Sequence, residues 1–566
     1  MSVQCENVAD VPDPAGSEQE PDEPDPDLAA EAAELLRGLL ADPWGQVSPS
    51  VYETGRVASL APWLGGHAER LEFLLAAQRP DGGWGAAGGY SLVPTLSATE
   101  AILADLHGPA AGGGTADRGA AGRAALARAA ERGLRALAPL LANATADTMP
   151  DMPAMELIST QLIRLINGRI GGLDGMPDDP VTRSAGTALR APESWRWAED
   201  ALDPLQDMLR AGQAVPEKLL HALEIAGPAA ARTASTRPGP RTGGIGASPA
   251  ATAAWLGTGD APPPDDPARR FLETAAARHG GPVPCGYPIT VFERAWVLSW
   301  LRRAGVPVTV PAELTASLRA SIGPQGTPAG EGLPADADTT SVTLHALALT
   351  GSPVEPDSLL AYELDDRFCT WQGEQGASAT TNAHVLDAFG EFVRVRPESR
   401  ARYAPAMAKA ASWLRSRQEP DGSWPDRWHV SPYYATSCAV QALRGFGGAA
   451  AAEHVRRARR WLLETQRPDG SWGCWEATAE ETAQAMLALL PADGREPERV
   501  RLAQLRAAVR GRAWLLRTRG WSDGPALWHD KDLYRPEAIV RAGILSALHL
   551  ARPDQALPGA AGGRGT

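Results

Sequence analysis

The chain has 566 residues, of which 54 are basic and 68 are acidic, and its net charge is -14 at pH 7. A single hydrophobic core stops growing near about 250 to 300 residues, so this length predicts two large domains. Nucleic-acid-binding proteins carry a basic face, and the acidic balance therefore argues against a nucleic-acid partner.

The N-terminal segment 1–27 includes "EQEPDEPDPD", which is acidic, rich in proline and without apolar residues. Such a composition cannot bury enough apolar surface to fold, so we expect a disordered tail there and another at 553–566. The cysteines form no CxxC pair, and we find neither a signal peptide nor an apolar run of about 18 residues. We expect a cytoplasmic protein without a transmembrane segment. Nothing in the sequence indicates its oligomeric state.

Apolar residues recur at helical spacing along most of the chain, for example in segments 153–166, 218–227 and 537–550. No long alternating pattern of the kind typical of strands competes with this spacing, so we expect an all-α fold. The Gly- and Pro-rich segment 258–267 separates two helical stretches. It predicts a domain boundary.

Three copies of one short motif follow predicted helices: "QRPDGGWG" (78–85), "QEPDGSWP" (418–425) and "QRPDGSWG" (466–473). In each copy the Asp-Gly pair forms a tight turn. The Gln and Trp side chains bring a hydrogen bond and a large apolar surface to the neighbouring helix. Repeats of this kind stabilise stacked helical pairs, so we assign them a structural role.

The segment "PADADTTSVTLHALALTG" (334–351) places Asp336 and Asp338 where a helix is about to begin. Asp, Ser and Thr are the usual helix N-caps, so capping explains these residues without any chemistry. The alternative is that one carboxyl is a catalytic acid, which requires a dry pocket around it. The local pattern leaves both explanations open.

The repeated motif is the QW motif of the terpene cyclases, and the resemblance extends from about residue 30 to 552. Segment 49–60 resembles the SAYDTAW segment of that family. Segments 378–389, 426–443 and 527–534 resemble class II cyclases of the copalyl and halimadienyl diphosphate synthase type. The resemblance implies two α-barrel domains (α/α toroids), γ inserted into β, with the active site between them.

By this resemblance, residues 28–60 form the N-terminal helical part of the β domain. Residues 61–257 form the inserted γ domain, and residues 258–552 form the rest of the β domain with the DADTT segment.

In this family a DxDD segment supplies the proton that starts cyclisation of a linear prenyl diphosphate. Here the segment is DADTT, so the resemblance assigns the acid to Asp338 and a supporting role to Asp336, with Thr339 in place of the last Asp. An alkene is a very weak base, so the donor must be a neutral acid in a dry site. A helix N-terminus favours the carboxylate, and burial and the second carboxylate must overcome this effect.

A carbocation formed by protonation is stabilised by aromatic faces, at about 2 kcal/mol or more when desolvated. Trp outnumbers Phe in this chain, 18 to 7. Trp296, Trp300 and Trp371 are the cavity candidates, whereas the Trp residues of the repeats are structural.

Cyclisation ends when a base removes a proton. In plant ent-copalyl members of the family, a His and an Asn act together through water. His221 matches the His, but Cys285 stands at the Asn position, which argues against an ent-copalyl product. Without its partner, His221 is either part of the terminating base or a partly buried helix histidine with no catalytic duty.

None of the three Asp-Asp pairs completes the DDxxD motif that ionises a diphosphate, so the product should keep its diphosphate. Arg427 and Lys531 stand at basic positions shared with the family, and we expect them to bind the prenyl diphosphate unless they are merely solvated at the surface. Glu156 matches a γ-domain glutamate associated with Mg²⁺ in the family. The resemblance therefore implies Mg²⁺ as a cofactor.

We favour farnesyl diphosphate as substrate and drimenyl diphosphate as product, because of the DxDTT variant and the incomplete His/Asn pair. The alternative is conversion of geranylgeranyl diphosphate to copalyl or halimadienyl diphosphate. A protein-prenyltransferase-like subunit would need a zinc site of Asp, Cys and His, which the sequence does not assemble. A non-catalytic α-barrel scaffold stays open because segment 49–60 departs from the family pattern.

Overall fold

The structure is a computed structural model that describes residues 27–107, 119–145, 148–171, 188–490, 496–518 and 521–552. Both tails expected to be disordered lie outside these residues, except for Asp27. That residue caps the first helix by accepting a hydrogen bond from Ala30 N at 3.1 Å. The described residues are mostly helical, which confirms the all-α prediction. No described helix is long and apolar enough to cross a membrane.

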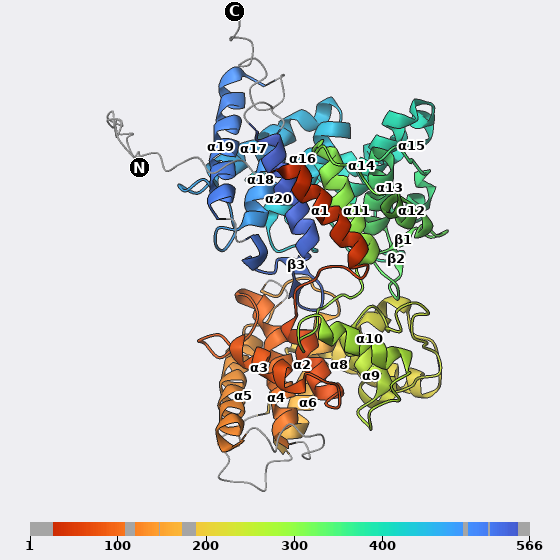
Figure 1. The fold of residues 1–566 in the computed structure, drawn as a ribbon, viewed down its shortest axis with the longest axis vertical. Helices are drawn as coiled ribbons and strands as arrows, with labels where there is room; N and C mark the ends of the chain where they lie inside the picture. The colour runs from red at the N-terminus through yellow and green to blue at the C-terminus, as the bar shows by residue number, and fades with distance from the viewer. Residues whose placement is uncertain are drawn as a thin grey trace, which may run out of the picture.

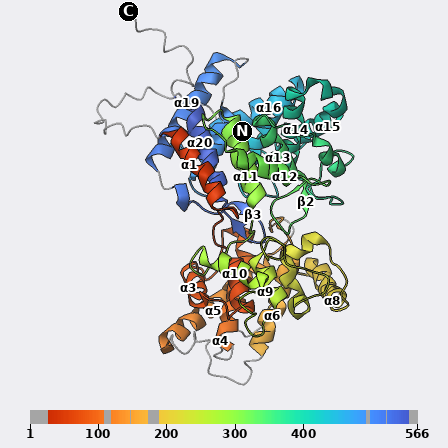
Figure 2. The same cartoon turned by 45° about the vertical axis from the view of Figure 1, so that its right-hand side comes forward.

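The helices form two groups, one above the other (Figures 1 and 2). The upper helical group contains α1 (Leu28–Ala41), α11 (Thr290–Arg303), α12 (Ala312–Ala320), α13 (Ala337–Leu349), α14 (Ala379–Val395), α15 (Arg400–Ser416), α16 (Pro432–Phe446), α17 (Ala452–Glu464), α18 (Ala479–Leu489), α19 (Glu498–Arg517) and α20 (Glu537–Leu550). The lower helical group contains α2 (Val51–Leu60), α3 (His67–Ala76), α4 (Leu92–His107), α5 (Gly119–Ala142), α6 (Met155–Gly171), α8 (Arg196–Arg210), α9 (Pro249–Leu256) and α10 (Pro267–Ala277). Short 3-10 helices are η1 (Gly88–Ser91), η2 (Glu193–Trp195), η3 (Glu217–Ala230), η4 (Pro356–Tyr362), η5 (Pro397–Ser399), η6 (Ala449–Ala451) and η7 (Trp521–Asp523).

Each helical group has its own apolar core. The core of the upper group takes in residues 28–47 and then resumes at residue 289. The two cores of the lower group use residues between 52 and 287. Helix α2 packs on α4 and α9, and α10 packs on α9. The packing therefore changes near residues 50 and 288, not at the expected boundaries of 60 and 258, because α2 and α10 bury their apolar faces in the lower group.

Two short antiparallel ribbons are the only strands among the described residues. Strand β1 (Thr327–Pro328) pairs with β2 (Ala335–Asp336), and β2 leads directly into α13. Strand β3 (Trp528–His529) pairs with β4 (Leu533–Tyr534), and both ribbons lie near the junction of the two groups (Figure 1). The ribbons therefore bring polar residues to the region where the groups meet.

Each QW repeat fixes a helix end in the same way. In the second copy, the side-chain amide of Gln418 donates to Gly422 O at 2.8 Å and to His454 O at 2.9 Å. The indole N–H of Trp424 donates to Leu414 O, at the end of the preceding helix, at 2.8 Å. The other two copies repeat these bonds. Because these Trp side chains are fully buried, the repeats are structural, as predicted.

Helix α1 closes the upper group by packing against α11 and α20. Arg541 on α20 lies 3.6 Å from a carboxylate oxygen of Glu31 and 3.5 Å from one of Glu34, both on α1. A backbone bridge between Val47 and Pro536 continues this contact below the helix. Segments more than 480 positions apart in sequence thus complete one ring of helices.

Candidate active site

A cavity of about 440 Å³ lies between the two helical groups. Its wall is formed in part by residues from segments 151–157 and 218–222 of the lower group and from segments 333–339 and 528–534 of the upper group. Such a volume lies within the usual range of small-molecule sites. The cavity wall includes eight of the ten site residues expected from the sequence: Glu156, His221, Asp336, Asp338, Thr339, Trp371, Arg427 and Lys531.

The two aspartates of the DADTT segment have different roles in the fold. Asp336 is the N-cap of α13, and its carboxylate accepts a hydrogen bond from Thr339 N at 2.6 Å. Asp338 lies in the first turn of α13 and points to α14, where its Oδ1 is 2.7 Å from Nδ1 of His384. Burial, opposed by the Thr339 N–H and assisted by the charge of Asp338, raises the pKa of Asp336 to about 7. Capping therefore explains Asp336, and the second carboxyl remains available for chemistry.

His384 was not expected from the sequence. Its side chain is almost buried, with 8% exposed, and that of Asp338 is 16% exposed. Burial opposes protonation of the ring, but the Asp338 carboxylate outweighs it and raises the pKa of His384 well above its usual value. The imidazolium form can donate Nδ1–H to Asp338 and leave the other carboxyl oxygen for a substrate. His384 lies in segment 378–389, which resembles class II cyclases, but the role of His384 becomes visible only through the contact between α13 and α14.

His221 lies in the wall of the same cavity. Its Nδ1 lies 2.6 Å from Gly246 O, and its Nε2 lies 2.8 Å from Oδ1 of Asp530. Burial opposes protonation, but the Asp530 carboxylate raises the pKa of His221, while the pKa of Asp530 is lowered to about 2 against the effect of burial. Cys285 is fully buried and is not among the residues that line the cavity. The partner of His221 is therefore Asp530, which pattern matching at residue 285 could not reveal.

Lys531 does not have the geometry expected of a diphosphate ligand. Its side chain is fully buried, and its ammonium forms an ion pair with Glu53 and another with Glu224 at 2.9 Å. It also donates to Ser248 Oγ at 2.8 Å and to His221 O at 2.7 Å. An ammonium has three N–H donors, and four acceptors already surround this one. This geometry does not support the prediction that Lys531 binds the diphosphate, because the charge of its ammonium is already balanced inside the protein.

Arg427 remains at the cavity wall but is not free. Its guanidinium forms an ion pair with Glu374, lies 3.2 Å from Asp151 across the junction of the groups, and stacks over Trp428 at 4.9 Å. Lys218, which is exposed and was not expected, also lines the cavity. Both cations can approach an anionic substrate group, with Arg427 exchanging or sharing its carboxylate partners.

The carboxylates at this end of the cavity include Glu156, in the first turn of α6, and Asp151. The described residues contain no cluster of three or more His, Cys, Asp or Glu side chains able to hold a metal ion. Mg²⁺ bound with a diphosphate usually takes only one or two carboxylates, with water and phosphate oxygens as its other ligands. The donor set of Glu156 and Asp151 fits that kind of site.

Aromatic side chains line much of the cavity. Trp371 is among them, as expected, and its ring meets that of Trp428 edge to face at 5.2 Å. Trp296 and Trp300 are not among the lining residues, so that part of the expectation is wrong. Trp296 lies one helical turn after Phe292, which takes the wall position, and the two rings are 4.4 Å apart. Further aromatic residues that line the cavity and were not expected are Trp197, Phe292, Trp428, Trp528 and Tyr534.

The comparisons with known proteins agree with this geometry. Residues 375–534 match the squalene-hopene cyclase C-terminal domain. The chain is 40% identical over 527 residues to the ent-copalyl diphosphate synthase of Streptomyces sp. strain KO-3988, covering 92% of this chain and 96% of that protein. The chain belongs to the bacterial class II terpene cyclases.

Two further relatives of this cyclase cover nearly its whole length. It is 39% identical to the labda-7,13-dienyl diphosphate synthase of Streptomyces clavuligerus, over 93% of each chain. The solved structure of an ent-copalyl diphosphate synthase from Streptomyces platensis matches with a TM-score of 0.85 and 42% identity, covering 93% of this chain and 99% of that one. The cyclase therefore has the βγ architecture expected from the sequence, and it is an enzyme. These matches do not support the prenyltransferase-like and scaffold alternatives.

Proposed function

We propose that this cyclase converts geranylgeranyl diphosphate into a bicyclic diphosphate of the copalyl type. The observation that carries the proposal is Asp338, which lines an aromatic cavity between the two helical groups and is bonded to His384. The relatives that support the choice of substrate are named for copalyl and labdadienyl diphosphates, whose skeletons derive from geranylgeranyl diphosphate. They support this reaction better than the farnesyl-to-drimenyl reaction expected from the DxDTT variant.

Asp338 starts the reaction as a neutral carboxylic acid that transfers its proton to the terminal alkene. His384 donates Nδ1–H to one oxygen of Asp338, and this hydrogen bond stabilises the carboxylate that proton transfer leaves behind. Asp336 lies close by with a pKa raised to about 7, so near neutral pH much of it carries no charge that would oppose this ionisation. The pair therefore provides a strong acid in a site with little competing water.

The carbocation is then held against aromatic walls until a base removes a proton. Phe292, Trp371 and Trp528 line the cavity, where the faces of their rings would stabilise the developing positive charge. The candidate for the terminating base is the pair of His221 and Asp530. Both ring nitrogens of His221 face acceptors, so the Asp530 carboxylate, which lines the cavity, takes the proton directly or through a water molecule. One proton enters and one leaves, so substrate and product are isomers and the diphosphate is retained.

The diphosphate binds at the lower end of the cavity. Arg427 and Lys218 supply positive charge there, and Glu156 with Asp151 would hold Mg²⁺ against the phosphate oxygens. Bound Mg²⁺ would offset the charge of the diphosphate. Proton transfer at Asp338 requires none of these groups, so they contribute to substrate binding and orientation.

The test is incubation of the purified protein with geranylgeranyl or farnesyl diphosphate, each with Mg²⁺, followed by phosphatase treatment and mass spectrometry of the alcohols. We expect a bicyclic C20 alcohol. We also expect kcat/KM for geranylgeranyl diphosphate to exceed that for farnesyl diphosphate at least about tenfold, which corresponds to about 1.4 kcal/mol in transition-state stabilisation. Asp338→Asn is the control for spontaneous cyclisation. A higher kcat/KM for farnesyl diphosphate would contradict the proposed substrate, and no cyclic product from either would contradict the proposed reaction.

A further inference from the structure

Three consecutive residues between β3 and β4 enter the lower helical group, and we call residues 530–532 the hairpin tip. Asp530 bonds to His221, which follows the start of η3. Lys531 forms ion pairs with residues on α2 and η3. Asp532 accepts hydrogen bonds from Ser50 Oγ at 3.0 Å and from Tyr52 N at 3.1 Å, at the start of α2. The hairpin tip is therefore fixed by the lower group, although its strands belong to the upper group.

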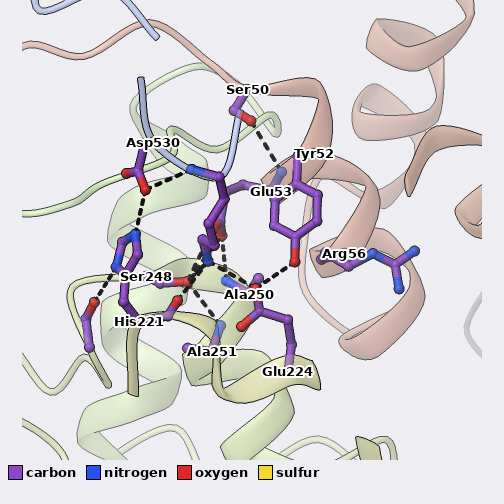
Figure 3. A network of polar contacts seen from close by, with 12 residues as sticks. Ser50, Tyr52, Glu53, Arg56, His221, Glu224, Ser248, Ala250, Ala251 and Asp530 are labelled. Carbon is purple, nitrogen blue, oxygen red and sulfur yellow. Dashed lines mark hydrogen bonds and ion pairs between the residues drawn. The ribbon is translucent and has the colours of Figure 1, made fainter. Parts of the chain in front are cut away.

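The central contact of the hairpin tip is a buried cation between two carboxylates. Figure 3 shows Glu53, Glu224 and Ser248 converging on this point. The carboxylate of Glu53 is itself fixed, since it accepts from Ala250 N at 2.6 Å and from Ser248 Oγ at 3.1 Å. Glu224 accepts the hydroxyl of Tyr52 at 2.6 Å. Neither carboxylate can move far without breaking bonds to α2, η3 or α9.

Lys531 is connected to His221 in two ways, through Asp530 and through the His221 main chain. Lys531 N donates to Asp530 Oδ1 at 2.7 Å, and that oxygen is also the one 2.8 Å from Nε2 of His221. The Lys531 ammonium donates to the backbone carbonyl of His221 at 2.7 Å. Figure 3 shows the His221 ring directed at Asp530, and its other nitrogen lies 2.6 Å from Gly246 O. The position of Lys531 therefore sets both the main chain of His221 and the carboxylate that orients its ring.

We propose that Glu53 and Glu224 are positioning residues that act through Lys531 to hold the pair of His221 and Asp530 where it removes the final proton. Neither Glu53 nor Glu224 is among the residues lining the cavity, so they do not act on the substrate directly. The inference rests on the proposed function, in which this pair terminates the reaction. It also gives segment 49–60, which departs from the SAYDTAW pattern, a role in the outcome of catalysis through Glu53.

The expected consequence is a change of product and not a loss of the first step. In the described part of the chain, Asp338 and His384 bond to each other and not to Glu53, Glu224 or the hairpin tip, so protonation of the alkene should continue when the cation is disturbed. A displaced His221 would leave the carbocation to lose a different proton or to be captured by water. The ratio of products is therefore the sensitive measurement, because a tenfold change needs only about 1.4 kcal/mol in relative barrier heights.

The first experiment compares Glu53→Gln with Glu100→Gln. Glu100 is a matched control because it too is a fully buried glutamate of the lower group, paired with Arg56 and Arg169, but has no contact with the hairpin tip. We expect Glu53→Gln to change the ratio of main to alternative products at least about tenfold, while substrate consumption stays within about threefold of the wild type. Glu100→Gln should lower the thermal midpoint without changing the product ratio. An unchanged product ratio in Glu53→Gln, or an equal change in the control, would overturn the proposal.

The second experiment measures the His221 pKa by NMR of protein labelled at histidine with ¹³C, with the signal assigned by its loss in His221→Phe. The positive charge of Lys531 lowers the pKa of His221 through space, so its removal in Lys531→Met would raise that pKa if charge alone mattered. If Lys531 positions Asp530, its removal instead disengages Asp530 and lowers the pKa. The two explanations predict opposite signs.

Lys531→Met leaves Glu53 and Glu224 buried without their cation, which is strongly destabilising. The double variant Lys531→Met/Glu53→Gln removes one charge of each sign and is used if Lys531→Met does not fold. We expect its His221 pKa to fall toward the usual value, and a value equal to that of the wild type would overturn the proposal. This titration requires no turnover, so it still tests the positioning link if the wild-type protein cyclises no prenyl diphosphate and the proposed function fails.

Discussion

The pair formed by Asp338 and His384 can be tested by a double-mutant cycle. Asp338→Asn removes the acidic proton but keeps an oxygen that can accept the Nδ1–H of His384, now 2.7 Å away. His384→Ala removes the donor and leaves the carboxyl in place. In Asp338→Asn, the carboxylate that raises the pKa of His384 is gone, so the ring should be neutral at pH 7 and the variant should fold.

The size of each effect follows from the roles of the two groups. General acids contribute about 10² to 10⁴ in rate, or about 3 to 5 kcal/mol in activation free energy, so Asp338→Asn should lose at least about a hundredfold in cyclisation. A hydrogen bond to a charged group is worth about 1.5 to 3 kcal/mol, so His384→Ala should lose about 10- to 150-fold. Because His384 acts only through Asp338, the double variant should lose no more than Asp338→Asn alone.

The assay is single-turnover conversion of geranylgeranyl diphosphate, with circular dichroism and thermal unfolding to show that each variant is folded. Thr95→Val, at the first QW repeat of the lower group, is a control because its hydroxyl contacts Trp84 and no cavity residue. It should lower stability and leave single-turnover rates unchanged. Turnover of Asp338→Asn near the wild-type rate would refute the assignment of the acid. Additive losses in the double variant would refute the idea that His384 acts through Asp338.

Three further predictions follow from the site. Turnover without phosphatase should release no pyrophosphate in step with product, since the described site offers no cluster of acidic ligands for ionising the diphosphate; stoichiometric release would contradict this. Chelation of Mg²⁺, or Arg427→Ala, should raise KM more than it lowers single-turnover rates at saturating substrate; a loss confined to the rate would place these groups in the chemical step. Burial raises the pKa of Asp336 from 3.8 to about 7, which corresponds to as much as about 4 kcal/mol of folding free energy lost as pH rises from about 4 to 7. Asp336→Asn keeps an N-cap oxygen but has no proton to lose. The difference in thermal stability between this variant and the wild type should therefore be larger, in favour of the variant, at pH 8 than at pH 5, and an equal difference at the two pH values would contradict this.

The all-α fold and the position of the acid segment could be predicted because they depend on local patterns. Helical spacing and the QW repeats are written in short segments, and DADTT precedes a helix by its composition alone. The identity of the aromatic residues that line the cavity could not be predicted in this way. Phe292 and Trp296 share one face of α11, and only the depth of that helix in its domain decides which ring reaches the cavity.

The charged residues show the same limit more sharply. A sequence displays the charge of Lys531 but not that Glu53, 478 positions earlier, neutralises it inside the protein. The same is true of His384 and Asp338, which meet because α13 and α14 pack together. The catalytic role of Asp338 stays a prediction, but its partner, its burial and its place in a cavity wall are now defined.

The closure of the upper ring by α1 and α20 has a consequence for biosynthesis. Residues 51–287 supply the apolar cores of the lower group and can begin to fold before the rest of the chain is made, because domains generally fold as units in the order of synthesis. Helix α1 is made first, but the surface that buries Leu35, Leu36 and Leu39 is not complete until α20 has been synthesised. During this interval the apolar face of α1 stays uncovered while the lower group, to which α1 is joined, has begun to fold. The nascent chain should therefore depend on chaperones most strongly at this late stage, after the apolar cores of the lower group have formed.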